Sequence, residues 1–343
     1  SDGVLADPSG EMIIKPCTAD EIAFYESANS SHPAFAAYMP TYMGTLSLDK
    51  PEAAESAAAT AEPTASGTAA TLGLDDVGPM HGKALETSRS IVLQNVAAGF
   101  SKPNILDIKL GAVLYDAAST RPEKRARLDK VAAETTSAPL GFRVAGMRVW
   151  QGAAAAAADA AAGSTSGVAG TDDTVSLDRA ANYKEFNKIY GRVFSADNVL
   201  AAFREYAVVP AAGVTPQMAL DVIRGFRAEL QNVQRVLEQE ESRMFSASLL
   251  FVYEGDPSRY KAAKEAERTT PAKAKAVEDD DAESEDEPPK VSALKMIDFA
   301  HASWTPGLGP DENALKGVRN VGKILEDLYS ELEVAQDQAA GGQ

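Results

Sequence analysis

Three segments of low-complexity sequence divide this chain of 343 residues and limit where a folded core can form. Residues 51–71 are rich in Ala, Glu, Thr, Ser and Pro, and residues 152–174 contain six consecutive alanines. Residues 262–290 pass from a Lys- and Ala-rich stretch into a strongly acidic one. None of the three has the apolar periodicity that would bury one face of a helix or strand. We therefore predict that they are disordered insert loops and that the core forms from the remaining residues.

The composition is that of a soluble globular protein, with 45% hydrophobic and 24% charged residues. A chain of this length favours two sub-domains over one. No run of about 18 apolar residues is present, so we expect no transmembrane segment, and the start shows no secretory pattern. Cys17 is the only cysteine, which excludes an intrachain disulfide and favours the cytosol or nucleus.

The formal net charge of −17 argues against direct binding of nucleic acid or of an anionic membrane. Acidic residues are most concentrated in one run, residues 278–287 (EDDDAESEDE), whereas five basic residues gather at 121–130. Charges in water are screened over about 10 Å. A polyanionic substrate at the basic cluster would therefore respond to that cluster rather than to the net charge.

The remaining sequence alternates between predicted strands and helices. Residues 4–6 and 12–15 flank Asp7-Pro8-Ser9-Gly10, which predicts a hairpin. Thr18 followed by Glu21 indicates the start of a helix over 18–29. Apolar or alternating stretches predict further strands at 90–96, 105–110, 141–150, 249–253 and 296–299.

A long helix is predicted to begin at Thr215-Pro216, with threonine as its N-cap and proline in the first turn. Its apolar residues recur at spacings of three and four, which places them on one face: Ala219, Ile223, Phe226, Leu230, Val233 and Leu237. We expect this face to pack in the core of the larger lobe.

The stretch from Pro103 to Gly111 reads as a strand with an apolar face and a charged face. Alternate residues of a strand share a face, so Asp107 and Lys109 point together, away from the apolar residues between them. An acid beside a base suits phosphoryl transfer, because one can orient a hydroxyl and the other can neutralise phosphate. The alternative is the exposed face of an edge strand.

Asp298 stands alone among apolar residues in Ile297-Asp298-Phe299. Burying a lone carboxylate is costly unless it is paired or binds a metal ion. Magnesium prefers few carboxylates together with substrate phosphates, so Asp298 is a candidate magnesium ligand. A loop or helix-capping aspartate is the alternative.

Lys15 follows two isoleucines, and Glu21 lies on the helix that comes next. A strand lysine held by a helix glutamate is how kinases position the phosphates of ATP. The alternative is a surface lysine, which is the usual position for this residue type.

The basic cluster of residues 121–130 would place several cations on one side of a helix, where they could bind phosphate. A solvated surface helix is the alternative. The sequence has no glycine-rich phosphate loop and no GxSxG element, and its one cysteine and three histidines are too scattered for a zinc site.

Taken together, these stretches resemble the inositol polyphosphate kinase family. Its signature PxxxDxKxG is present in full as Pro103, Asp107, Lys109 and Gly111. Residues 123–150, the YGR element at 190–192, residues 246–260 and residues 297–313 also resemble its multikinase branch, and an acidic insert at this place is typical of the fungal members. The resemblance covers nearly the whole chain outside the three low-complexity segments.

The resemblance implies an α+β, two-lobed, protein-kinase-like fold with an antiparallel sheet in each lobe. Residues 1–97 would form the N-terminal lobe and residues 98–343 the catalytic lobe, with an inositol-phosphate-binding helix at 117–137. ATP would lie between the lobes, with magnesium as its partner ion.

The resemblance also implies a role for individual residues. Those expected to bind ATP are Lys15, the backbone of Gln94, Asn95 and Val96, Asp107 and Asp298. Those expected to bind magnesium are Asp298 and Ser248. Those expected to bind the inositol phosphate are Lys109, Lys124, Arg125, Arg127, Lys130 and His301. Asp107, Lys109 and Asp298 form the expected catalytic set.

The implied reaction is ATP-dependent phosphorylation of inositol 1,4,5-trisphosphate to the tetrakis- and pentakisphosphates. The alternatives are an inositol hexakisphosphate kinase, a phosphoinositide 3-kinase activity, and a transcriptional scaffold that binds a transcription factor through acidic residues 278–287. The family implies a monomer in the nucleus and cytoplasm.

Overall fold

The computed structural model describes residues 4–47, 89–153, 173–269 and 290–341. The segment 51–71 and the acidic run 278–287 lie outside the described residues, as does most of 152–174. Residues 262–269 were predicted to belong to a loop but instead complete helix α8 (Pro257–Thr269). Their Lys, Ala, Glu and Arg side chains are strong helix formers, and α8 buries Tyr260 and Ala263.

An antiparallel sheet forms the N-terminal part of the molecule. Within the described residues it has four strands in the order β1-β2-β4-β3. The strands are β1 (Leu5–Ala6), β2 (Met12–Pro16), β3 (Tyr42–Ser47) and β4 (Arg89–Gln94). The predicted hairpin is confirmed, because β1 pairs antiparallel with β2 and the Asp7 carboxylate accepts a hydrogen bond from the Met12 N–H at 2.8 Å.

Helix α1 (Ala19–Ser31) follows β2, and the short α2 (Pro33–Ala36) follows α1. The predicted N-cap is confirmed, since the Thr18 hydroxyl accepts a hydrogen bond from the Glu21 N–H at 3.2 Å. This cap fixes where α1 begins. It thereby places Glu21 in the first turn of α1, shortly after the strand that carries Lys15.

A second, larger antiparallel sheet follows. Within the described residues its six strands have the order β11-β10-β5-β6-β8-β7. They are β5 (Pro103–Leu110), β6 (Phe142–Trp150), β7 (Val175–Asp178), β8 (Tyr183–Phe186), β10 (Ser248–Glu254) and β11 (Ser292–Ile297). Strand β5 pairs with a neighbour on each side, which excludes the edge-strand alternative for Asp107 and Lys109.

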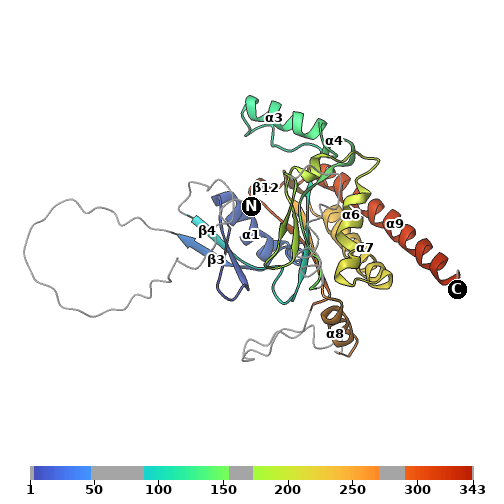
Figure 1. The fold of residues 1–343 in the computed structure, drawn as a ribbon. Coiled ribbons are helices and arrows are strands. Elements are labelled where there is room, and N and C mark those ends of the chain that lie inside the picture. Colours follow the sequence, from blue (N-terminus) through green and yellow to red (C-terminus); the bar gives the residue numbers. More distant parts are fainter. Residues whose placement is uncertain (1–3, 48–88, 154–172, 270–289, 342–343) are drawn as a thin grey trace, which may run out of the picture.

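Helices cover one face of the larger sheet, as Figure 1 shows. They are α6 (Leu200–Ala207), α7 (Pro216–Gln239) and α9 (Glu312–Gly341), and α7 packs along α9. All six apolar residues predicted for the face of α7 are buried, and Thr215 caps the helix as expected. Leu106, Ile108 and Leu110 of β5 are also buried, which leaves the charged face of β5 on the opposite side.

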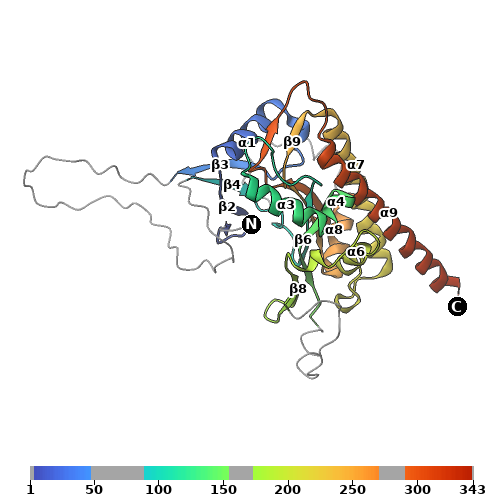
Figure 2. The ribbon, with the colours of Figure 1, turned by 90° about the horizontal axis from the view of Figure 1, so that it is seen from above.

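The remaining elements are short and lie around this core. They are α3 (Pro122–Ala133), α4 (Ser137–Leu140), η2 (Tyr190–Arg192), η3 (Pro210–Ala212), β9 (Ser242–Met244) and β12 (Ala302–Trp304). Strands β9 and β12 pair antiparallel and lie beside α1, as the view in Figure 2 also shows. None of the helices among the described residues has the length and apolar character needed to cross a lipid bilayer.

The bounds predicted for one helix and one strand were wrong. The helix expected at 117–137 begins only at Pro122 and ends at Ala133, because Pro122 takes the first helical position and the residues before it form turns. The strand expected at 296–299 ends at Ile297, so Asp298 lies just beyond a strand and not within one. The fold is α+β with two large antiparallel sheets, as predicted, and a two-stranded sheet of β9 and β12 in addition. The lobe boundary at 97/98 stays a prediction.

Candidate active site

Lys15 on β2 is held by two carboxylates. Its ammonium nitrogen lies 2.8 Å from Oε1 of Glu21 and 2.7 Å from Oδ1 of Asp298. Burial disfavours the ammonium ion, but Asp298 and Glu21 outweigh this effect and raise the pKa of Lys15. The lysine therefore stays charged at neutral pH, and the predicted Lys15–Glu21 pairing is confirmed. The surface-lysine alternative is excluded, because only 12% of the Lys15 side chain is exposed.

Asp298 has an unusual backbone conformation. Its φ of 67° lies in the left-handed region, which a non-glycine residue adopts at a cost. Although burial opposes its ionisation, the ammonium groups of Lys15 and Lys109 hold the pKa of Asp298 below its usual value. The turn at the end of β11 thus presents a carboxylate that is ionised at neutral pH and directed towards the N-terminal sheet.

The register of the larger sheet brings further polar residues into one row. Lys109 on β5 is paired with Arg143 on β6 and with Ser248 on β10, and Ser248 is paired in turn with Ile297 on β11. Directly paired residues of antiparallel strands point to the same face. Arg143, Lys109 and Ser248 therefore share one face, and Asp298 follows at the end of the row.

Asp107 lies two residues before Lys109 on the same face of β5. Burial raises the pKa of this carboxyl group, with Lys109 opposing the effect. Its Oδ1 atom is buried and has no hydrogen-bond partner in the part of the chain that the structure describes. The hydroxyl oxygen of Ser248 is buried as well and forms no hydrogen bond of good geometry, although it lies close enough to Asp107 to lower the pKa of that carboxyl group. A buried acceptor without a partner is costly, which suggests that a ligand completes both groups.

These residues fit a nucleotide with a divalent cation. No group of three or more His, Cys, Asp or Glu side chains within the described ranges forms a ready metal site. Magnesium does not require one, since it uses one or two protein oxygens together with phosphate oxygens and water. Asp298 and the Ser248 hydroxyl supply such oxygens, while Lys15 supplies a cation for the phosphates.

The predicted adenine-binding segment, Gln94 to Val96, begins at the last residue of β4. Its N–H groups are not all available, because those of Gln94 and Asn95 donate to the carbonyl groups of Thr41 and Glu11, at 2.9 and 2.7 Å. Within the described residues the Val96 N–H has no such partner. Of the three predicted N–H groups, that of Val96 is therefore the one placed to meet a base.

A cavity of about 770 Å³ adjoins this row. Its walls come from α1, the loop before α3, strand β9 and the segment around β12. Lys124 and His301 both line it, and both were predicted to bind substrate. The pKa of His301 responds to Lys109 as well as to Lys124, so this part of the cavity wall lies within electrostatic range of the charged row.

The other predicted phosphate-binding cations do not reach the cavity wall. Arg125 donates to the Thr120 carbonyl at 2.6 Å and also to the Ala117 carbonyl, so it holds the loop before α3. Arg127 and Lys130 are exposed on α3, where Lys130 lies 3.7 Å from Glu134. Of the four predicted clamp residues, the structure brings only Lys124 to the cavity.

Two cations were missed by the sequence prediction. Arg143 shares the face of Lys109, and burial together with the nearby Arg192 lowers the pKa of Arg143. The Arg143 guanidinium donates to the Ser137 hydroxyl at 2.9 Å, and neither arginine forms a salt bridge with another described residue. Adjacent guanidinium groups repel each other unless an anion lies between or beside them. The only signal in the sequence was the position of Arg192 in the YGR element.

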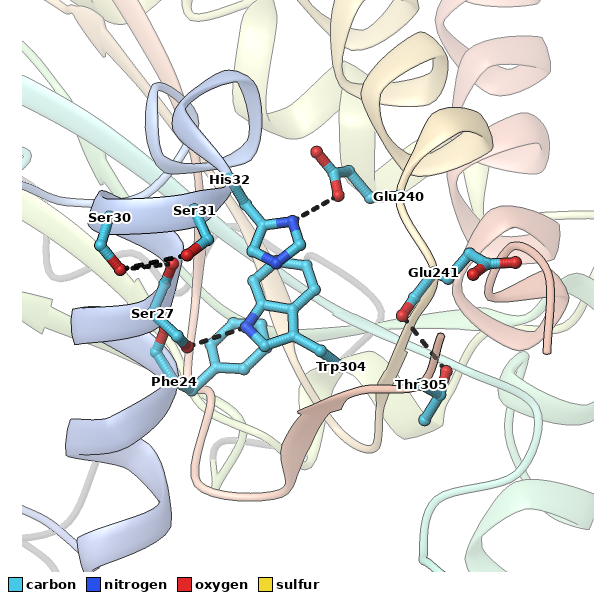
Figure 3. Close-up of polar contacts among 9 residues, drawn as sticks. All are labelled: Phe24, Ser27, Ser30, Ser31, His32, Glu240, Glu241, Trp304 and Thr305. Atoms are coloured by element: carbon cyan, nitrogen blue, oxygen red, sulfur yellow. Dashed lines mark hydrogen bonds and ion pairs between the residues drawn. The ribbon is translucent and has the colours of Figure 1, made fainter. Parts of the chain in front are cut away.

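Trp304 anchors helix α1 to the larger part of the molecule, as Figure 3 shows. Its ring stacks between those of His32 and Phe24, with centroid distances of 3.6 and 4.6 Å, and its indole N–H donates to Ser27 at 2.8 Å. His32 in turn lies 2.6 Å from a carboxylate oxygen of Glu240, which follows α7. Because α1 also carries Glu21, this anchor helps to fix the Lys15 pair.

Replacing Trp304 with alanine is expected to lower the free energy of unfolding by about 3 kcal/mol, since both stacking contacts and the Ser27 bond are lost. Replacement with phenylalanine keeps an aromatic ring and should cost only about 1 kcal/mol. Denaturation in urea measures both values. Equal losses for the two variants would contradict the proposed anchoring by stacking.

The comparisons with known proteins agree with this geometry. The sequence pattern described as "Inositol polyphosphate kinase" matches residues 90–326. The chain is 32% identical over 369 residues to an inositol polyphosphate multikinase of Saccharomyces cerevisiae, covering 93% of each protein. It is 29% identical to the human inositol hexakisphosphate kinase 1, but spans only 53% of that protein.

Solved structures of inositol phosphate multikinases also match this chain. The crystal structure of an inositol phosphate multikinase from S. cerevisiae, in complex with ADP and Mn²⁺, matches with a TM-score of 0.65 and 30% identity. The match covers 93% of this chain and 99% of that one. A second inositol phosphate multikinase structure matches with a TM-score of 0.51 at 16% identity, which supports the fold alone.

Proposed function

The chain belongs to the inositol polyphosphate kinase family, and from this premise we propose that it phosphorylates soluble inositol polyphosphates with ATP and magnesium. The observation that carries the proposal is the row of Lys109, Ser248 and Asp298 beside the Lys15 pair and the adjoining cavity. The row supplies groups for the transferred phosphate, and the cavity has room for a substituted cyclohexane ring and carries polar groups, among them Lys124 and His301, in a partly apolar lining.

Each side chain has a distinct task in this proposal. Lys15 and Lys109 offset the negative charge on the phosphate oxygens as the γ-phosphoryl group is transferred. Asp107 accepts a hydrogen bond from the ring hydroxyl, orients its oxygen towards phosphorus and takes up its proton as the new bond forms. The bond from this oxygen to phosphorus forms as the bond to the ADP oxygen breaks, so no covalent enzyme intermediate is needed.

Asp298 and Ser248 would hold magnesium, which when bound neutralises phosphate charge and aligns the phosphate chain. On the substrate side, Lys124, His301, Arg143 and Arg192 would bind the phosphates already present on the ring. Arg127 and Lys130 stay predicted substrate contacts, which would require α3 to lie closer to the cavity.

The test is a time course with magnesium-ATP and inositol 1,4,5-trisphosphate, with products separated by chromatography. Successive appearance of tetrakis- and pentakisphosphate is the expected result. A reaction that stops at tetrakisphosphate would indicate a narrower trisphosphate kinase. Phosphorylation of inositol hexakisphosphate instead would favour the pyrophosphate-forming branch, and phosphorylation of a phosphoinositide lipid would favour the lipid-kinase alternative.

Substrate binding should also be coupled to proton uptake at His301. Partial burial and the ammonium groups of Lys124 and Lys109 hold the pKa of this imidazole below its usual value, against Glu21 and Asp116. The free enzyme therefore carries a largely neutral His301 at pH 7. Bound phosphates stabilise the protonated form and raise its pKa, so a proton is taken up.

Calorimetric titration with inositol 1,4,5-trisphosphate near pH 6.5, in two buffers of different ionisation enthalpy, measures this uptake. The variant His301→Gln should take up less proton than the wild type. Because the ligand's own titration is common to both proteins, equal uptake would exclude His301 as the responsive group.

A second role is proposed for the acidic run 278–287, namely binding of a transcription factor in a protein found in both nucleus and cytoplasm. It is supported only by the charge pattern of the sequence, and the run lies outside the described residues. Deleting residues 275–289 would separate the roles. Loss of partner binding with full kinase activity would support the second role, and unchanged binding would reject it.

A further inference from the structure

Two carboxylates, Asp20 and Asp116, line the cavity that would receive a polyanionic substrate. Asp20 belongs to the first turn of α1, and Asp116 belongs to the loop between β5 and α3. Lys124 and His301 line the same cavity. Acidic side chains at such a place oppose the binding of phosphate, so their presence requires a reason.

The cavity lining has no excess of positive over negative charge. Its three basic residues are Lys124, Arg243 and His301. The Arg243 guanidinium donates to the carbonyl groups of Ser242, Gly309 and Leu308, at 2.6, 2.9 and 2.7 Å. With His301 largely neutral, the two carboxylates balance the charges of Lys124 and Arg243. Further positive charge lies on the neighbouring row, at Lys109 and Arg143, and on Arg192 near Arg143.

Neither carboxylate forms a salt bridge within the described residues, although the charge of Arg125 acts on Asp116. The Asp20 side chain is exposed, and it has no hydrogen bond or ion pair with any other residue in the described ranges. Asp116 accepts a hydrogen bond from the Ala118 N–H at 2.9 Å, which helps to keep its pKa low and the group ionised. An ionised carboxylate can only accept hydrogen bonds, so it attracts a hydroxyl group and repels a phosphate.

We propose that Asp20 and Asp116 select the phosphorylation state of the substrate. They accept hydrogen bonds from free hydroxyl groups of the inositol ring and disfavour rings that carry phosphate at those positions. The inference rests on the proposed function and adds to it, because it predicts preference for partly phosphorylated rings over inositol hexakisphosphate. At a separation of several ångströms, each like-charge contact would weaken binding about 10-fold.

Calorimetric binding without ATP tests the proposal, using inositol 1,4,5-trisphosphate and inositol hexakisphosphate as the two ligands. The variant Asp20→Asn keeps the shape of the side chain and removes its charge. We expect it to bind hexakisphosphate about 10-fold more tightly than the wild type does, with a much smaller change for trisphosphate. The double variant with Asp116→Asn should shift the ratio of the two affinities further.

Glu123→Gln is the matched control, because Glu123 lies on α3 near the cavity but does not line it. This variant makes the same change in net charge and should leave the ratio of affinities unchanged. An unchanged ratio in Asp20→Asn would overturn the inference, as would an equal shift in Glu123→Gln. The proposed function fails separately, if the wild-type protein phosphorylates no inositol phosphate at all.

Discussion

Replacing Asp298 with asparagine is expected to lower kcat about 1,000-fold while the protein stays folded. The change removes the negative charge that would hold magnesium and that pairs with Lys15 at 2.7 Å. Steady-state kinetics with magnesium-ATP measures the effect. Binding of ATP without magnesium should change far less, because that interaction does not need the carboxylate.

Asparagine is the informative replacement because φ at this position is 67°. Asn adopts the left-handed region more readily than most residues, whereas alanine there would add strain of about 1–2 kcal/mol. Asp298→Ala should lose activity to a similar degree but with lower stability. Asp327→Asn, on the exposed side of α9, serves as the control for charge. Near-normal turnover of a folded Asp298→Asn variant would reject the assigned role.

Replacing Lys109 with alanine is expected to lower kcat about 100- to 1,000-fold. The Lys109 ammonium group lies 2.9 Å from the Ser246 carbonyl oxygen and on the same face as Arg143 and Ser248. From there it can neutralise charge that develops on the transferred phosphate. Its loss should also weaken trisphosphate binding, since one cation of the row is removed.

Lys261→Ala provides the comparison, because Lys261 is an exposed lysine on α8, away from the row. It should retain wild-type kinetics. The far-ultraviolet circular dichroism of both variants should match that of the wild type, which separates loss of chemistry from loss of fold. A Lys109→Ala variant with wild-type kcat would show that the charge at this position is not used in transfer.

Much of the site could be predicted from the sequence because its key residues lie on regular, strongly patterned elements. The alternation in Pro103–Gly111 fixed the faces of β5, and the structure confirms that Leu106, Ile108 and Leu110 are buried. The signature glycine also has a physical reason. Gly111 has a φ of 102°, and a Cβ there would lie 2.8 Å from the side-chain nitrogen (Nδ2) of Asn313 and 2.9 Å from the Val113 carbonyl oxygen.

The YGR element is explained by the same kind of contact. A Cβ on Gly191 would lie 1.9 Å from the Val144 carbonyl oxygen, so η2 can pack against β6 only with glycine at this place. That packing sets Arg192 near Arg143. The motif was visible in the sequence, but its reason is a contact between segments that lie far apart along the chain.

What the sequence did not reveal depends on strand pairing and on turns. Asp298 was expected within a strand because its neighbours are apolar, yet the strand ends one residue earlier and the chain turns. Arg143 was missed because its relation to Lys109 comes only from the register of β5 with β6. Periodicity gives the face of a residue but not its partner on the next strand.

The position of the basic cluster relative to the cavity could not be predicted, for the same reason. Helical spacing placed several cations on one side of a helix, but it could not show which side meets a cavity. The late helix start at Pro122 leaves Arg125 bound to the preceding loop and Lys124 at the cavity wall. The acids Asp20 and Asp116 gave no signal at all, since isolated aspartates are common on surfaces.

The most direct test of the account is phosphorus NMR of a reaction containing the wild-type protein, magnesium-ATP and inositol 1,4,5-trisphosphate. The ATP γ-phosphate signal should fall while the signals of ADP and of a new phosphomonoester on the ring grow in equal amounts. The Asp298→Asn and Lys109→Ala variants should show almost none of this conversion. Formation of ADP with free orthophosphate and no new ring ester, or no reaction while ATP binds, would contradict it.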